Sequence, residues 1–153
     1  MVHAKDFNSF FIIETFTQFS ILIFYFMEEK KNYFLVDGIK VHWNFKLLPK
    51  GFEAITLFGH VFDVRKKESL RNYLNTRDGK VMINHERIHM LQAGSFKLRY
   101  FIFYLIYLWY WFIGLWKYSF NSDRSYYNIP FEKEAYNNER NFSYSETNWK
   151  MYI

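Results

Sequence analysis

Apolar and polar positions along the chain indicate three regions: an apolar N-terminal stretch, a strand-rich region and a helical region. The first stretch, residues 7–27, is mostly apolar and long enough to span a bilayer as a helix, although Glu14 and Gln18 interrupt it on one face. Since no small-residue cleavage site follows it, we expect residues 1–30 to form a retained hydrophobic anchor. The alternative is an amphipathic helix that packs on the rest of the chain.

The strand-rich region comes next. Apolar residues 33–36 and the alternating run 39–45 flank the dipeptide Asp37-Gly38, and this combination predicts a β-hairpin. Residues 54–64 predict a further strand, with a kink at its glycine. We therefore expect a small sheet in the N-terminal half.

Helical periodicity dominates the rest of the chain. The turn-forming residues 76–79 and the polar run 121–128 predict loops, and Pro130 suits the first turn of a helix. The last residues, 141–153, are polar and aromatic, and we expect them to be loosely ordered. The predicted helices cover residues 68–74, 80–92, 100–116 and 131–142.

The helix predicted over residues 100–116 is apolar on all sides and has no charged residue between Arg99 and Lys117. Its length of about 26 Å is slightly less than the hydrocarbon core of a bilayer, which is about 30 Å thick. Its many Tyr and Trp residues favour the lipid–water boundary. We therefore expect a membrane-associated helix within residues 97–118 that lies in the interface or at a shallow tilt.

Composition constrains the chemistry. Aromatic residues form 24% of the chain, the net charge is +5 and cysteine is absent. Without cysteine there are no disulfides and no thiolate ligands, so a metal site must use histidine and carboxylate. The positive charge predicts an anionic partner. Because the aromatic residues cluster and no nucleic-acid motif accompanies the charge, we expect membrane lipid and no nucleic acid.

Residues His85 to His89 form the pattern HExxH. Positions four apart lie on one face of a helix, so His85 and His89 can offer both imidazoles to one metal ion. Glu86 lies beside that ion, where a general base can take a proton from a zinc-bound water. An ordinary polar helix with surface histidines is the alternative.

A catalytic zinc ion usually has three protein ligands and one open position. Gln92 and Ser95 stand where an extended metzincin pattern would require Gly and His, so that class is excluded. We do not expect the third ligand among the upstream histidines, His3, His42 and His60.

The segment Phe131 to Tyr136 resembles the E-x-x-A helix of gluzincins, in which the first Glu is the third zinc ligand. The match is to Glu132, followed at the required offset by Ala135. Glu134 lies about 200° away around the helix, so the two carboxylates cannot both face the metal. The resemblance favours His85, His89 and Glu132 as the ligands of Zn²⁺, with Glu134 as the alternative to Glu132. Exposed carboxylates near a helix N-terminus would be the non-functional explanation.

Together the motifs resemble a gluzincin-like zinc metallopeptidase, and the chain is similar to uncharacterised bacterial membrane proteins with HExIH and FExEAY segments. The resemblance covers roughly residues 50–140. It implies an α+β, mainly α, minimal zincin-like fold: a small N-terminal β-hairpin or sheet, the HExxH helix, the aromatic helix and a glutamate-bearing helix. It also implies a metallopeptidase domain over residues 31–153, in which the strand at 54–64 borders the cleft.

Where related membrane peptidases usually have Asp after the Ala, this chain has Tyr136, which leaves Asp123 or Glu139 to orient a ligand. The expected function is that of a zinc-dependent peptidase at or near a membrane surface, in which Glu86 activates the water that attacks a peptide bond. The residues available to stabilise the oxyanion are Tyr126, Tyr127 and Tyr136.

Two alternatives remain at this point. One is a non-catalytic membrane protein with a structural or vestigial metal site, and the other is a lipid-surface binding module. A three-ligand site also requires residues 85–89 and 132 on one side of the membrane, which is incompatible with a single crossing by the intervening helix. Either this helix dips into the bilayer and the chain returns, or it lies in the interface, or Glu132 is not a ligand; we favour the interface. Lys30 and Lys31 follow the N-terminal anchor, which favours a catalytic part on the cytoplasmic side of a bacterial membrane. Substrate and oligomeric state stay open.

Overall fold

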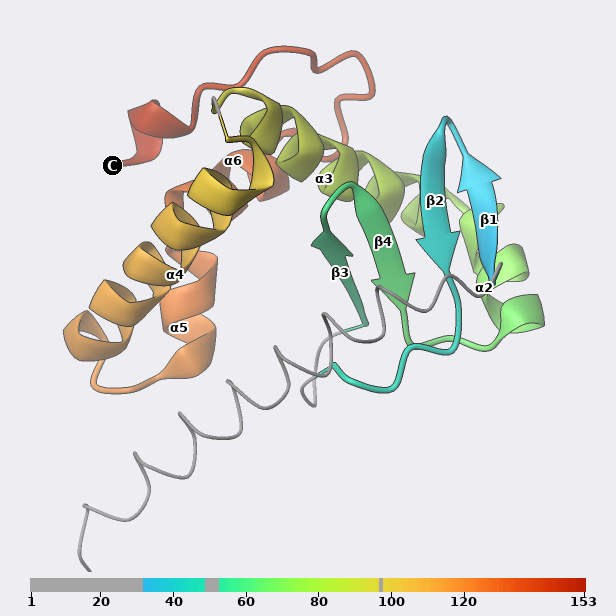
Figure 1. Cartoon of the computed structure of the whole chain (residues 1–153), viewed down its shortest axis with the longest axis horizontal. Helices are drawn as coiled ribbons and strands as arrows, with labels where there is room; N and C mark the ends of the chain where they lie inside the picture. The colour runs from blue at the N-terminus through green and yellow to red at the C-terminus, as the bar shows by residue number, and fades with distance from the viewer. Residues whose placement is uncertain (1–31, 49–52, 97) are drawn as a thin grey trace, which may run out of the picture.

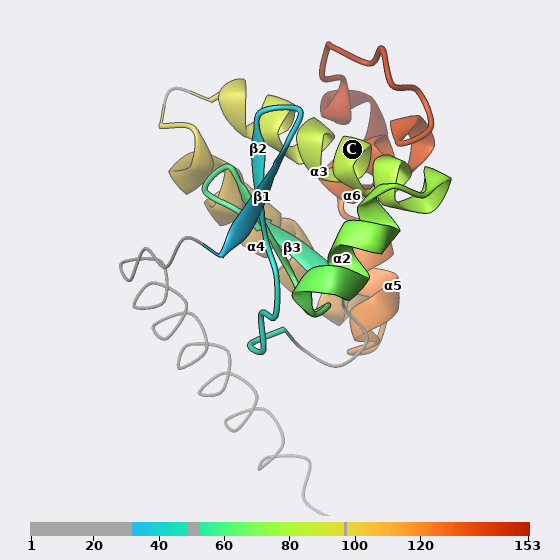
Figure 2. The ribbon, with the colours of Figure 1, turned by 90° about the vertical axis from the view of Figure 1, so that its right-hand side faces the viewer.

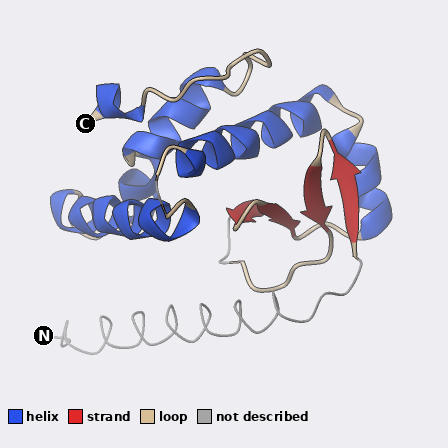
Figure 3. Ribbon diagram, turned by 45° about the horizontal axis from the view of Figure 1, so that its top comes forward, coloured by secondary structure: helices blue, strands red, loops and turns tan. Residues whose placement is uncertain are grey.

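The computed structural model describes residues 32–48, 53–96 and 98–153 as an α+β fold with one small sheet. The predicted N-terminal anchor, residues 1–30, lies outside the described residues. In chain order the elements are β1 (Tyr33–Val36), β2 (Ile39–His42), β3 (Ala54–Leu57), β4 (His60–Asp63), α2 (Lys67–Leu74), α3 (Arg77–Gly94), α4 (Tyr100–Lys117), α5 (Ser122–Tyr127), α6 (Pro130–Asn138) and the 3₁₀ helix η1 (Trp149–Tyr152). The sheet lies at one end, α4 and α5 lie at the other, and α3 runs between them (Figures 1 and 3).

The four strands are ordered β1-β2-β4-β3. The predicted hairpin is confirmed, because β1 and β2 pair antiparallel across Asp37 and Gly38, both of which have positive φ. The central strands β2 and β4 pair in parallel, and β3 pairs antiparallel with β4. Within the described residues, β3 is therefore an edge strand, and it is the strand closest to the helical end (Figure 1).

The core at the sheet end lies between the strands and the helices α2 and α3. Val41 and Val61, on neighbouring strands, pack with Leu70 of α2 and Ile83 of α3, and all four are buried. Alternation along β2 turns every second residue toward this core and leaves its neighbours partly exposed. Figure 2 views this end of the molecule, with β1 and α2 in front of α4.

The prediction of one continuous strand over residues 54–64 is wrong, because the chain reverses at Phe58 and Gly59. These residues have φ values of 50° and 83°, and positive φ at both positions is typical of a two-residue type I′ turn. Phe seldom adopts such a conformation, so the turn gives little sequence signal. The N–H of Phe58 donates to the hydroxyl of Tyr104 at 2.9 Å, which holds the turn against α4.

The helix with the HExxH pattern is longer than predicted, since α3 begins at Arg77 and ends at Gly94. Thr76 is its N-cap, and the Thr76 hydroxyl accepts a hydrogen bond from the N–H of Gly79 at 3.1 Å. Gly79 thus lies in the first turn of α3 rather than in the predicted loop. The absence of a side chain matters there, because a Cβ would lie 2.1 Å from the carbonyl oxygen of Tyr73.

The polar run predicted as a loop contains α5. Asn121 caps this helix, since its side-chain oxygen accepts from the N–H of Arg124 at 2.9 Å. The next helix, α6, has Pro130 in its first turn as predicted but ends at Asn138, earlier than the periodicity indicates.

The C-terminal tail, residues 141–153, is packed against the domain rather than loosely ordered. The buried Trp149 ring lies 4.8 Å from the ring of Phe131, measured between centroids. The hydroxyl of Tyr144 donates to Glu134 at 2.6 Å. These contacts hold the tail against α6. Because each contact joins residues that are ten or more positions apart, the local sequence of the tail does not predict it.

The aromatic helix is confirmed as α4. One side of it packs on the protein: Phe103 lies 4.8 Å from Phe131 of α6, between ring centroids, and Gly114 lies against Ser125 of α5. The chain then reverses through α5, so α6 returns to α3. Among the helices of the described segments, none has both the length and the hydropathy needed to cross a membrane.

Candidate metal centre

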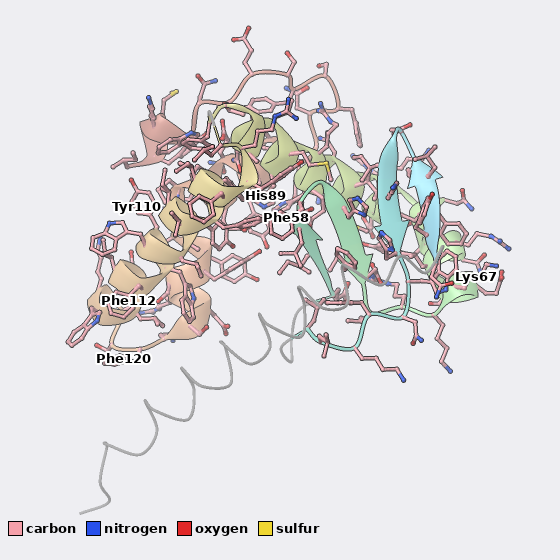
Figure 4. The ribbon with its side chains drawn as sticks, viewed as in Figure 1. Phe58, Lys67, His89, Tyr110, Phe112 and Phe120 are labelled. Carbon is pink, nitrogen blue, oxygen red and sulfur yellow. The ribbon has the colours of Figure 1, made fainter. Side chains whose placement is uncertain are left out.

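Two histidine side chains of α3 converge as the HExxH spacing predicts. His85 and His89 lie one turn apart, both are buried, and their Nε2 atoms are 3.2 Å apart. Their surroundings come from both halves of the molecule: Figure 4 shows His89 where α3 faces α4 and the turn at Phe58.

Glu132 of α6 completes the group. Its carboxylate oxygens lie 3.3 Å from Nε2 of His85 and 3.2 Å from Nε2 of His89, and its side chain is buried. The fully buried Ala135, one turn later, belongs to the same part of α6 that packs on α3. The structure therefore brings together the three predicted ligands, and it identifies them as a group that could hold a metal ion.

The three donor atoms suit a small divalent cation. Ligands at about 2.0–2.2 Å from a tetrahedral zinc ion lie roughly 3.3–3.6 Å from one another. The two Nε2 atoms are 3.2 Å apart, Oε2 of Glu132 lies 3.3 Å from Nε2 of His85, and Oε1 of Glu132 lies 3.2 Å from Nε2 of His89, so each separation is within about 0.1 Å of this range. In addition, Oε2 of Glu132 is buried and has no hydrogen-bond partner within the described part of the chain. A cation at this point would satisfy that oxygen, and two imidazoles with one carboxylate form a donor set typical of catalytic zinc.

Hydrogen bonds on the far side of each ring fix which nitrogen faces the group. Nδ1 of His85 lies 3.1 Å from the carboxylate of Glu139. A carboxylate can only accept, so Nδ1 carries the proton and Nε2 presents its lone pair. The structure thus selects Glu139 rather than Asp123, which is exposed on α5, as the residue that orients a ligand.

His89 is oriented by an amide instead of a carboxylate. Its Nδ1 lies 2.8 Å from Oε1 of Gln92, while the amide nitrogen of Gln92 donates to the carbonyl of Phe131 at 3.0 Å and to Glu134 at 2.7 Å. Since both of these partners accept, the amide oxygen must face the histidine. His89 therefore also presents Nε2 to the group.

Glu134 is the alternative ligand that the structure does not support. Its fully buried carboxylate faces away from the two imidazoles and accepts from Gln92, from the hydroxyl of Tyr144 and from the backbone N–H of Asn148. It orients His89 through Gln92 and anchors the tail. The helical offset between residues 132 and 134 separates these two roles as predicted.

The charge preference of the cluster agrees with a cation site. Burial by itself lowers the pKa of His85, but the neighbouring carboxylates of Glu132 and Glu139 outweigh burial and raise that pKa to about 10. Burial opposes ionisation of Glu132, yet the nearby His89 and His85 lower the pKa of Glu132 overall. In the absence of a metal, protons supply the positive charge that this carboxylate requires.

Glu86 lies beside the group, on the wall of a cavity of about 210 Å³ that His89 and Glu132 also line. The hydroxyl of Thr56 in β3 donates to Oε2 of Glu86 at 2.5 Å, which fixes the position of the carboxylate. The remaining walls come from β3, from apolar and aromatic residues of α4 and from Tyr126 of α5. The expectation that the strand region 54–64 borders a cleft is therefore met by β3.

Of the tyrosines considered from the sequence, Tyr126 lines the cavity, whereas the ring of Tyr136 packs on His85 at 4.6 Å between centroids. Tyr127 is exposed and packs on Tyr136. Tyr107 of α4 was not expected at the site, yet it lines the cavity and donates to Glu132 at 2.7 Å. No local spacing distinguishes Tyr107 from the other tyrosines of α4.

The upstream histidines take no part in the group, as predicted for those that are described. His42 and His60 lie on neighbouring strands, where Nε2 of one is 2.9 Å from Nδ1 of the other. Burial and the neighbouring His60 lower the pKa of His42 to about 4. His3 lies outside the described residues.

Comparison with known proteins gave no relative: no family model, no curated protein and no solved structure matches the chain. What the site can do therefore follows from its own residues. A buried His₂Glu donor set, a carboxylate beside it and an adjoining cavity are the features that metal-assisted hydrolysis requires.

Proposed function

We propose that the chain is a zinc-dependent peptidase in which His85, His89 and Glu132 hold the metal and Glu86 is the general base. The observation that carries this proposal is the convergence of three donors, at separations that suit tetrahedral zinc, beside a separate carboxylate that lines a cavity. When bound, zinc would acidify a water molecule and polarise the scissile carbonyl.

The residues of the chain supply the other parts of the reaction. Glu86 would take the proton of the attacking water and deliver it to the leaving amine. Thr56 holds Glu86 in place for this transfer. Tyr107 and Tyr126 line the cavity and could donate to the oxyanion of the substrate once each releases its present hydrogen bond with Glu132.

The arrangement also supports a minimal zincin-like fold. An edge strand, the HExxH helix and a helix with the third ligand occur in this order along the chain, and the edge strand β3 borders the cavity. An extended peptide could pair with such an edge, although the hydroxyl of Tyr104 now donates to the carbonyl of Thr56 at 3.1 Å.

The direct test replaces the base and keeps the ligands. We expect Glu86→Gln to bind zinc to the same stoichiometry as the wild type, because Glu86 is not a ligand, and to lose peptide cleavage by about 10²–10⁴-fold. Metal analysis and a fluorogenic peptide library measure the two properties. The matched control is Glu146→Gln, which alters an exposed glutamate of the tail.

Full turnover in Glu86→Gln would exclude Glu86 as the base. A wild-type protein that binds zinc, cleaves no peptide of the library and unfolds when zinc is removed would instead favour the alternative of a non-catalytic protein with a structural metal.

A further inference from the structure

One side of α4 is exposed along its whole length, and every exposed side chain from residue 101 to residue 116 is apolar. A helix on a water-exposed surface normally turns polar residues outward. The exposed positions recur at helical spacing, and we call them the α4 face: Phe101, Leu105, Leu108, Trp109, Phe112, Ile113 and Trp116.

The α4 face is large for a protein surface. Its members are 42–67% exposed. Because large apolar side chains have areas of roughly 150–250 Å², the seven together expose on the order of 700 Å². Contiguous apolar patches above a few hundred Å² mark interaction sites. Figure 4 shows Phe112 and the neighbouring Phe120 at the outer end of α4, while Lys67 lies at the opposite end of the molecule.

Charge identifies the kind of partner. Exposed Arg99 and Lys117 lie at the two ends of α4, and no acidic residue occurs between Glu86 and Asp123. The whole chain also has a net charge of +5. An apolar strip between basic ends complements a bilayer with anionic headgroups, which attract lysine and arginine at the surface of the hydrocarbon.

The α4 face has too few hydrogen-bonding groups for a typical interface with another protein. Protein interfaces have about one hydrogen bond per 100–200 Å² of buried area. The seven side chains offer only the indole N–H groups of Trp109 and Trp116. Indoles are, however, well suited to the boundary between headgroups and acyl chains. The opposite side of α4 packs on α5 and α6, so the helix would lie in the plane of the interface.

We propose that the α4 face docks on a bilayer that contains anionic phospholipid, and that the cavity of the metal centre opens next to that bilayer. Leu108 links the two features, because it is 47% exposed on the α4 face and also lines the cavity. Tyr104 and Tyr107, which line the cavity, lie on the adjoining side of the same helix. On the basis of the proposed peptidase function, the substrate class would be polypeptide segments at the lipid–water boundary.

Labelling at single cysteines tests the docking directly, since the chain has no cysteine of its own. An environment-sensitive NBD label would be placed at Leu105→Cys and at Phe112→Cys. The matched control is Leu35→Cys on β1, which is 69% exposed at the sheet end. With vesicles of phosphatidylcholine and phosphatidylglycerol, we expect a blue shift and an intensity gain of about two-fold or more at positions 105 and 112, and none at position 35.

Three outcomes would overturn the docking proposal. The first is that full-length protein floats with the vesicles while the labels at 105 and 112 keep their emission in water, because another segment would then hold the chain. The second is a shift at position 112 that occurs without vesicles and rises with protein concentration, because a second copy would then cover the α4 face. The third is a shift of equal size at position 35.

A second measurement separates the location of the cavity from the activity itself. One fluorogenic peptide is offered free in solution and tethered to a vesicle lipid by its end. We expect the tethered form to be cleaved at least ten-fold faster, and Phe112→Glu to remove this advantage without changing cleavage of the free form. Equal rates for both forms would overturn the location of the cavity at the bilayer. No cleavage of either form, with the NBD shift intact, would overturn the peptidase function alone.

Discussion

The imidazoles of His85 and His89 are oriented by different kinds of partner, a partly exposed carboxylate and a fully buried amide. Glu139 is the partner that can be changed with little risk to the fold. We expect Glu139→Leu to lower zinc affinity by about 10–100-fold. The reason is that Nδ1 of His85 then has no hydrogen-bond acceptor, so the imidazole ring is no longer held in the orientation that binds the metal. Competition with a chromophoric chelator measures this affinity.

The control for this change is Glu139→Gln, whose amide oxygen can still accept from Nδ1 of His85. It should retain most of the affinity that Glu139→Leu loses. Equal affinities for the wild type and Glu139→Leu would show that Glu139 does not orient the ligand.

Thr56 is also a positioning residue: it positions Glu86, the proposed base, as Glu139 positions His85. Thr56→Val keeps the volume of the buried side chain and removes the hydroxyl that donates to Glu86. A hydrogen bond to a charged group contributes about 1.5–3 kcal/mol, so we expect kcat to fall by roughly 10–100-fold with the zinc content and KM unchanged.

Steady-state kinetics beside metal analysis check this expectation. Thr56→Ser, which keeps a hydroxyl, should restore most of the lost kcat. If the valine variant turned over as fast as the wild type, Glu86 would be held by other contacts.

The residues of the site differ in how far the sequence alone identifies them. His85, Glu86 and His89 could be assigned because their spacing on one helix determines their geometry. Glu132 could be assigned with the help of Ala135, since the pair repeats a known helical offset. Thr56 could not, because its hydroxyl meets Glu86 only once β3 lies beside α3.

At the scale of elements, the contact between α2 and α3 depends on a glycine. A Cβ at Gly79 would meet the carbonyl of Tyr73 at 2.1 Å, whereas a Cβ at Gly94 would have no atom within 4 Å. We therefore expect Gly79→Ala to destabilise the fold by about 1–3 kcal/mol, although alanine is the better helix former. Gly94→Ala, the matched control, should be neutral or stabilise by up to about 1 kcal/mol.

Urea unfolding of both variants, followed by circular dichroism, gives the two free energies. An equal gain in stability for Gly79→Ala and Gly94→Ala would contradict the close approach of the two helices. The same glycine explains why α3 begins earlier than the sequence predicts: a residue that usually breaks a helix is placed inside it by tertiary packing.

The local sequence pattern predicts whether most elements are helices or strands, but it does not predict the residues at which they begin and end. The hairpin at Asp37-Gly38 has the residues that its turn requires, so it was predictable. The turn at Phe58 has a residue that disfavours positive φ, and a hydrogen bond to Tyr104 of α4 supports it. The tail, similarly, is fixed by Glu134 and by packing of Trp149, which are contacts between distant parts of the chain.

At the scale of the whole molecule, the metal centre lies between two apolar clusters that do not contain its ligands. One cluster joins the sheet to α2 and α3, and the other joins α3, α4, α6 and η1. Most of the buried apolar area, and hence most of the driving force for folding, is thus independent of the metal. This arrangement differs from that of small domains which zinc alone holds together.

We therefore expect the metal-free chain to stay folded and to be less stable. Zinc at about 100 times its Kd should stabilise the folded state by about 2.7 kcal/mol and raise Tm by roughly 5–10 °C. Thermal melts by circular dichroism, with zinc and with a chelator, measure the difference. His89→Leu should melt at the same temperature in both conditions, because it lacks one of the three ligands. Loss of the circular dichroism signal at room temperature on chelation would instead assign the metal a structural role and remove the reason to regard this site as catalytic.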